Sequence, residues 1–188
     1  MARNIHIFAF AVLAVSALVS SVSVNAQTFE LPKFSVGTFH SAKGFGVSVD
    51  LSNYDSAHLN SFALFLDMQS ILDGQSSSPG IRARYNYNHP LCSKDLKNGD
   101  KFQLYAGPGV TFGYVRDLNS RVGFMCGVSG EIVGTFLFEN HLSLSLALEA
   151  SAAFHLREDN NIGVLDFKFF QAGLVNLYQP ELRIQYYW

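Results

Sequence analysis

The sequence predicts an all-β fold, an eight-stranded antiparallel up-and-down β-barrel that crosses a membrane with its strands. Apolar and polar residues alternate over long stretches, and a period of two indicates strands with two different faces. The 188-residue chain contains 17 Phe, 8 Tyr and 15 Gly. After residue 26, however, no apolar run is long enough for a membrane helix. The alternating segments number eight, and an even number suits a closed up-and-down barrel.

The first 26 residues have the pattern of a secretory signal. Arg3 precedes a largely apolar run from Ile5 to Val19, and the small-residue site Val24-Asn25-Ala26 follows. We expect residues 1–26 to be a cleaved signal peptide and residues 27–188 to form a single barrel domain. The alternative is an uncleaved membrane anchor, but the apolar run is short for one and no charged flank follows it.

The first three predicted strands lie in the N-terminal half of the chain. GFGVSVDLS (44–52) and LNSFALFLDMQ (59–69) each place apolar side chains at every second position, with an Asp on the opposite face. GIRARYNYN (80–88) alternates Ile, Ala and Tyr with Arg and Asn. Turn-forming residues at 53–58 and 73–79 separate these strands.

The next three predicted strands carry the strongest alternation. They are KFQLYAGPGVTFGYV (101–115), VGFMCGVSGEIVGTFLF (122–138) and HLSLSLALEASAAFHL (141–156). The last of them is far longer than the five or six residues usual in soluble proteins, and it matches a tilted transmembrane strand. Within the first, Gly107-Pro108-Gly109 predicts a bend or bulge, because proline cannot donate to a strand ladder.

Two further strands complete the predicted eight. Residues 164–178 begin with alternation and lose it near Phe170-Gln171, where we expect a bulge. Residues 180–188 alternate to the end of the sequence. The segment KFSVGTFHS (33–41) either extends the first strand across a kink or forms a separate hairpin strand. A separate strand here, together with one further strand missed elsewhere, would make a barrel of ten strands. We prefer a barrel of eight strands.

The apolar faces are expected to point outward, to lipid. Large aromatic residues gather near strand ends, as they do at both interfaces of membrane barrels. The opposite faces consist largely of Gly, Ser, Ala and Thr, which are small enough for the narrow inside of an eight-stranded barrel. They carry fewer charged residues than a water-exposed surface would. The alternative is a soluble lipocalin-like barrel or sandwich, in which the apolar faces would meet in a core.

The C-terminal strand carries a resemblance to a known signal. Leu182, Ile184, Tyr186 and Trp188 place apolar or aromatic residues at alternate positions up to a terminal aromatic. This resembles the recognition signal by which outer-membrane β-barrels are handed to the barrel assembly machinery. Residues 33–188 as a whole resemble the small outer-membrane β-barrel families that include OmpX and the OmpA membrane domain. The resemblance implies the outer membrane of a Gram-negative cell envelope, with lipid and the assembly machinery as partners.

Charged residues on the inward faces are the candidate site. They balance at four acidic and four basic residues: Asp50, Asp67, Arg82, Arg84, Glu131, Glu149, Lys168 and Arg183. We expect a salt-bridge network that fills the lumen, because eight strands enclose a space just wide enough for side chains. The alternative is a charged lining that makes a pore selective.

Other classes of function find little support. Lys and Arg number 13 against 15 Asp and Glu, a formal charge of −2, which gives no reason to expect a nucleic-acid partner. No cofactor is implied, and His89 with Cys92 falls short of the three or four ligands of a zinc site. Cys92, in a predicted loop, and Cys126, on a predicted lipid face, are expected to stay unpaired.

We therefore expect a non-enzymatic barrel with a structural or surface-interaction role. With the N-terminus in the periplasm, the contact loops would be Asn53 to Leu59 and His89 to Lys101. A small transport or ligand-binding barrel is the first alternative. A lipid A deacylase-like enzyme is the second, because His141-Leu142-Ser143 with Glu149 is similar to the H-x-S arrangement of those enzymes. Alternation turns His141 and Ser143 inward, away from a lipid substrate.

Overall fold

A computed structural model describes residues 33–52, 58–74, 78–96, 99–117, 122–159, 164–175 and 180–188. The proposed signal peptide and the start of the proposed domain at residue 27 lie outside these residues. The strands are β1 (Phe34–Ser41), β2 (Gly44–Ser52), β3 (Leu59–Asp67), β4 (Gly80–Asp95), β5 (Lys101–Arg116), β6 (Val122–Leu137), β7 (Leu142–Asp159), β8 (Val164–Phe169) and β9 (Glu181–Tyr187). Two four-residue helices, α2 (Gln69–Leu72) and α3 (Ala172–Val175), interrupt the strand order.

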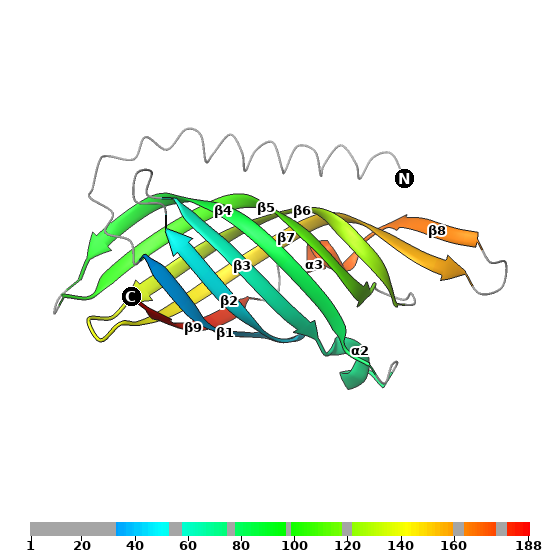
Figure 1. Cartoon of the computed structure of the whole chain (residues 1–188), viewed down its shortest axis with the longest axis horizontal. Coiled ribbons are helices and arrows are strands. Elements are labelled where there is room, and N and C mark those ends of the chain that lie inside the picture. The colour runs from blue at the N-terminus through cyan, green and yellow to red at the C-terminus, as the bar shows by residue number, and fades with distance from the viewer. Residues whose placement is uncertain are drawn as a thin grey trace.

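Eight of the strands close into an antiparallel barrel. Each strand from β1 to β7 pairs with the next one in the sequence, β9 pairs with β7, and β1 pairs with β9 to close the ring. β8 stands outside the ring and pairs with the last part of β7 alone. Figure 1 shows the strands crossing the molecule at a common tilt, with β8 at the end away from the C-terminus. The predicted eight-stranded up-and-down barrel is confirmed.

The eight strands of the closed wall are not the same eight that the sequence predicts. Residues 34–41 form a separate strand, β1, which pairs with β2 along its whole length through a tight turn at Ala42-Lys43. The predicted strand 164–178 is not one strand, because β8 ends at Phe169 and α3 follows. The loss of alternation near Phe170 therefore marks the end of a strand, and the expected bulge there is wrong.

The strands are strongly staggered around the ring. The line of direct partners from Leu146 on β7 passes around every other wall strand and returns to β7 at Leu156, ten residues further along. A stagger of this kind tilts the strands against the barrel axis by roughly 35–45°.

Both described ends of the chain lie at one end of the barrel. The Lys33 amide donates to the Trp188 carbonyl at 3.0 Å, and the Ser52 amide donates to the Lys33 carbonyl at 3.2 Å. The connections from β2 to β3 and from β4 to β5 therefore lie at this same end. The sequence placed these connections, 53–59 and 89–101, opposite the N-terminus, and that placement is wrong because β1 adds one crossing before β2. Residues 89–95 also belong to β4, which runs to Asp95 with a register shift between Pro90 and Cys92.

The outer surface of the wall is apolar and the interior is largely polar. Exposed positions on the wall strands carry large apolar residues, including Phe45, Val47, Phe62, Leu64, Ile81, Val110, Phe112, Phe124, Val128, Ile132, Phe136, Leu146, Phe154, Leu182 and Ile184. Buried positions on the same strands carry Ser, Thr, Asn, Gln, Glu and Arg. This arrangement is the reverse of that in a soluble barrel or sandwich, where the apolar faces are buried.

Candidate functional site in the barrel interior

The centre of the lumen is a buried ion-pair network that joins strands on opposite sides of the barrel. Arg82 and Arg84, both on β4, contact Glu149 on β7, with Arg82 Nη2 3.0 Å from Glu149 Oε2. Arg84 also forms an ion pair with Glu181 on β9. Because Arg84 contacts two carboxylates from different strands, it is the hub of the network.

A second branch of the network starts from Arg183 on β9. Its guanidinium lies 2.5 Å from Glu131 Oε2 on β6 and 3.2 Å from Glu181 Oε2. Asn88 Nδ2 donates to the other oxygen of Glu131 at 2.7 Å. Five of the predicted residues, the three arginines with Glu131 and Glu149, therefore meet in one network.

Glu181 is a member of this network that the sequence reasoning missed. It precedes Arg183 by two positions and therefore lies on the same face of β9. Alternation alone is enough to place Glu181 inside, since Arg183, two positions later on the same strand, is assigned to the interior. With Glu181, two carboxylates surround Arg84.

Asp50 occupies the interior closer to the chain ends and is held by neutral donors. Ser61 Oγ donates to it at 2.6 Å, Gln185 Nε2 at 2.6 Å and Ser35 Oγ at 3.2 Å. The side chains of β1, β3 and β9 thus share one carboxylate on β2. Hydrogen bonds to an ionised group are shorter and stronger than those between neutral groups. Because two of the donors come from β1 and β9, this cluster joins the first and last strands of the wall.

Two inward phenylalanines cover the arginines. Phe39 on β1 and Phe65 on β3 stack with ring centroids 5.7 Å apart. The Arg84 guanidinium lies 5.2 Å from the Phe39 ring, and the Arg82 guanidinium lies 5.3 Å from the Phe65 ring. Such cation–π contacts add attraction where water is excluded.

Two predicted network residues lie elsewhere. Asp67 is the last residue of β3, at the barrel end, and its carboxylate accepts the Gln69 amide at 3.0 Å at the start of α2. Lys168 on β8 pairs with Asp166 at 2.9 Å, and its side chain is 59% exposed. Its assignment to the interior is wrong because β8 is not part of the closed wall. At the Asp67 end, Lys43 is buried in its turn, and burial lowers the pKa of this lysine although Asp67 opposes the shift.

Glycines bring the interior groups close to the backbone. A Cβ atom at Gly109 on β5 would lie 1.8 Å from Asn86 Oδ1, and one at Gly107 would lie 2.0 Å from the Tyr87 carbonyl oxygen. The two glycines of Gly107-Pro108-Gly109 therefore let the backbone of β5 lie close to Asn86 and Tyr87 of β4, and β5 is continuous through this segment. The register shift between the two strands lies on β4. The lumen at this level has no space for larger side chains.

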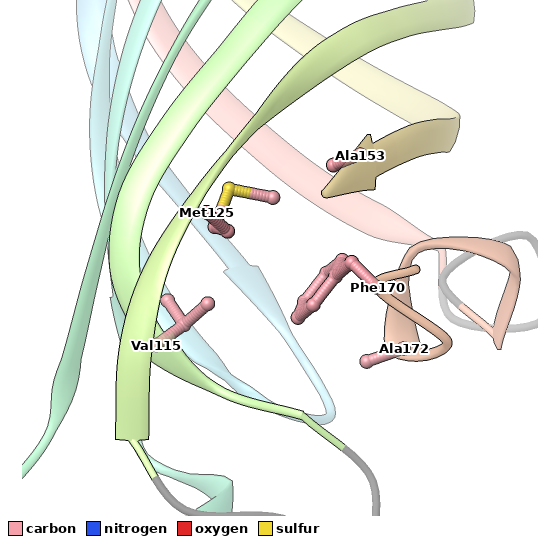
Figure 2. Close-up of a cluster of buried hydrophobic side chains, with 5 residues drawn as sticks. All are labelled: Val115, Met125, Ala153, Phe170 and Ala172. Atoms are coloured by element: carbon pink, nitrogen blue, oxygen red, sulfur yellow. The ribbon is translucent and has the colours of Figure 1, made fainter. Parts of the chain in front are cut away.

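At the end of the lumen opposite the chain ends, a segment that folds inward forms an apolar cluster with the wall. Phe170 packs with Val115, Met125, Ala153 and Ala172 in one buried cluster (Figure 2). Asp117, at the end of β5, accepts the amide of Gln171 at 3.1 Å and that of Ala172 at 2.8 Å. We call residues 170–173 the plug.

The other residues singled out from the sequence are distributed over the surface. Leu182, Ile184, Tyr186 and Trp188 point outward on the C-terminal strand, and the Trp188 ring lies 4.8 Å from that of Tyr186. Cys92 and Cys126 are both exposed and free. Cys92 belongs to β4 and is not in a loop.

The H-x-S arrangement is not assembled as a catalytic pair. His141 is exposed in the turn before β7 with φ of 66°, and its ring contacts Tyr186 and Tyr187. Its expected inward direction is wrong, because β7 begins one residue later. Ser143 is buried and donates to the Gln185 carbonyl at 3.4 Å. Glu149 is already engaged by two arginines.

Comparisons with known proteins returned nothing similar: no protein-family model, no curated protein and no solved structure matches this chain. Among the residues described, no helix is long and apolar enough to cross a membrane. Within that same part of the chain, no group of three or more His, Cys, Asp or Glu residues is arranged to hold a metal ion.

Proposed function

We propose that this chain is an integral outer-membrane β-barrel protein with a closed interior and a structural or surface-interaction role. The observation that carries the proposal is the inversion of polarity, with large apolar side chains on the outside of the wall and charged or amide side chains inside. Apolar surface of this extent is unfavourable in water and favourable in hydrocarbon, and closed barrels satisfy all backbone hydrogen bonds within a bilayer. The signal-like N-terminus and the aromatic C-terminal strand support export and assembly.

The closed interior argues for a scaffold in preference to a conducting pore. Arginines from β4 and β9 contact carboxylates from β6, β7 and β9, so side chains cross the lumen at its centre. If the chain ends face the periplasm, the surface-exposed end is the one that carries α2 and β8 (Figure 1). A surface partner would then meet this end, and not the connections at 53–59 and 89–101.

Electrophoresis of detergent-extracted protein tests the membrane-barrel proposal. Folded membrane barrels resist SDS until they are boiled, so unboiled and boiled samples should migrate differently, and the protein should fractionate with the outer membrane. Recovery in the soluble fraction without detergent would contradict the proposal. Purified protein in planar bilayers should give no steady ion conductance, and a regular open-channel conductance would favour the transport alternative.

A further inference from the structure

The barrel wall has a short side and a tall side. β1, β2 and β3 contain 8, 9 and 9 residues, whereas β4, β5 and β6 contain 16 each. At the chain ends, backbone hydrogen bonds join the start of β7 to the end of β9, β9 to the start of β1, and β1 to the end of β2 (His141–Tyr187, Lys33–Trp188 and Lys33–Ser52). The difference in height therefore lies at the opposite end, where the β1–β2 hairpin ends well before β6 and β7 (Figure 1).

The apolar outer surface differs in height in the same way. At a rise of 3.3 Å and a tilt of about 40°, each residue adds about 2.5 Å along the barrel axis. The exposed apolar positions of β6 from Phe124 to Phe136 then span about 30 Å, and those of β2 from Phe45 to Leu51 span about 15 Å. Membrane barrels carry an apolar band about 25 Å tall, so the β1–β2 side falls short by about 10 Å.

Polar side chains occupy the outer face of the short side. Thr38 and His40 are successive outward residues of β1, and both are exposed. The line of direct partners from Leu146 through Leu182 to His40 rises about two to three residues over two strands, given the stagger of the ring. His40 therefore lies at the level of Leu148, near the middle of the apolar outer face of β7. An ionisable side chain that faces hydrocarbon at this level is costly and indicates a function.

The helix α2 adds polar residues beside the turn of the β1–β2 hairpin. The Met68 amide donates to the Lys43 carbonyl in this turn at 2.7 Å, and α2 then begins with Gln69 and Ser70. Polar groups therefore follow directly after Phe45, the last large apolar residue of the short side. In a membrane, headgroups and water would reach down to the hairpin turn on this side.

We propose that the short side of the wall, residues 36–47 of β1 and β2, thins the bilayer and speeds the movement of phospholipids between its two leaflets. A bilayer adjusts to an apolar surface that is too short by becoming thinner beside it. A phospholipid headgroup then crosses a shorter distance, and the polar groups of Thr38 and His40 form hydrogen bonds with it or with its water on the way. The path runs along the outside of the barrel, so the lumen stays closed. This inference rests on the proposed membrane location.

Depth-dependent quenching by brominated lipids tests the thinning. Trp188→Phe removes the one tryptophan of the chain, and Phe45→Trp or Val110→Trp then introduces a single reporter. The two positions share one height, because the line of partners from Phe45 to Tyr114 rises about four residues over three strands and Val110 lies as far before Tyr114 on β5. The native side chains are 45% and 49% exposed. Each protein is refolded into phosphatidylcholine vesicles with bromine either near the headgroup or at the middle of the acyl chains.

The two reporters should sense different depths. Val110→Trp should be quenched more by bromine at the middle of the chains, because the wall is tall around it. Phe45→Trp should be quenched at least about twofold more by bromine near the headgroup than by bromine at the middle, because the bilayer is thinner there.

Extraction of a fluorescent phospholipid by albumin tests the movement itself. Albumin removes the labelled lipid from the outer leaflet alone and is too large to pass an eight-stranded barrel, so later loss of fluorescence measures lipid that has crossed. The wild-type protein should speed this later loss at least about tenfold over protein-free vesicles, and His40→Leu or Thr38→Val should slow it about threefold. Tyr85→Phe is the matched control, because it removes a polar group from the outer face of the taller β4, and it should leave the rate unchanged.

The outcomes separate this inference from the proposed function. If neither tryptophan reporter is quenched by any brominated lipid, the membrane location itself is wrong. If both reporters are quenched best at the same depth, the bilayer is not thinned and the inference is overturned while the membrane location stands. Extraction that is no faster with wild-type protein than without it, or that is equally fast with His40→Leu and Thr38→Val, would also overturn the inference.

Discussion

Arg84 on β4 and Glu149 on β7 form a buried ion pair across the lumen of the barrel. The two strands are separated by β5 and β6 in the wall, so the contact crosses the lumen. Arg84 also contacts Glu181, and Glu181 contacts Arg183, so the pair belongs to a chain of charges that reaches β6 and β9. Removing one member leaves its partners charged and buried.

The first prediction concerns this hub. Arg84→Ala should reduce the free energy of unfolding by about 3–5 kcal/mol, because Glu149 loses one partner and Glu181 loses its principal one, and both carboxylates are buried. Urea unfolding in detergent or lipid vesicles measures the change. Lys168→Ala removes a cation from an exposed pair and should change stability little. Equal effects of the two substitutions would mean that the central network does not stabilise the barrel.

Glycines provide a second prediction about the crowded lumen. Gly109→Ala should destabilise the barrel by about 1–3 kcal/mol, because the added methyl group overlaps Asn86 Oδ1 and the Tyr85 carbonyl oxygen. Gly130→Ala is the matched control on the outer face of β6, where the nearest atom to an added Cβ is 3.7 Å away. Unfolding midpoints of the two variants should differ clearly, and an unaffected Gly109→Ala would indicate a roomier lumen.

The sequence predicted the wall well where alternation was long. β2 has the expected bounds, and the inward positions of Arg82, Glu131 and Arg183 follow from parity alone. Alternation reports the two faces of a strand but not its partners, and for this reason the role of 33–41 as a separate strand was left open. Once β1 is counted, each connection from the one after β2 to the one after β7 lies at the end opposite to the expected one.

The plug was invisible to the same reasoning for a physical reason. Its backbone amides are satisfied by Asp117, which is more than fifty residues away in the sequence. The local residue pattern carries no signal of hydrogen bonds to a residue so distant in the sequence. The end of the apolar–polar alternation at Phe170 was the one available sign of the plug. The contacts of Phe39 and Phe65 with the arginines likewise depend on which strands become neighbours in the wall.

The C-terminal strand supplies a third prediction. Replacing Trp188 with Asp, or deleting it, should block assembly into the outer membrane while leaving export intact, because the aromatic end is the proposed assembly signal. Trp188→Phe should assemble, since it keeps the aromatic ring. Cell fractionation with the heat-modifiability gel measures folded protein, and wild-type levels in Trp188→Asp would rule out the signal.

The cysteines supply a fourth prediction. Cys92 and Cys126 are free and exposed on different wall strands, so they should remain unpaired in the exported protein. Cys126 should react with a membrane-permeable maleimide more readily than with a charged one, because its neighbours across β5 and β7 are Phe112 and Phe154. Mass spectrometry of non-reduced peptides would detect a disulfide, and finding one would require a different strand arrangement.

The final prediction separates a lipid-facing wall from a packed apolar core at Leu146. Leu146→Arg should destabilise by roughly 2–4 kcal/mol if this residue lies near the bilayer midplane. Ser145→Ala, on the inner face, should cost about 0.5–1.5 kcal/mol, because it removes the 2.9 Å hydrogen bond to Thr135. Stability alone does not identify the surroundings of Leu146, since an arginine would also disrupt a protein core.

Accessibility supplies the missing distinction. A spin label at Leu146 should collide with lipid-soluble oxygen more often than with a water-soluble quencher, because an exposed apolar site within a bilayer is reached by the first and not by the second. A label at Leu104, on the outer face of β5, should behave in the same way. Labels shielded from both quenchers would place these leucines against another protein surface, and the membrane proposal would then be wrong.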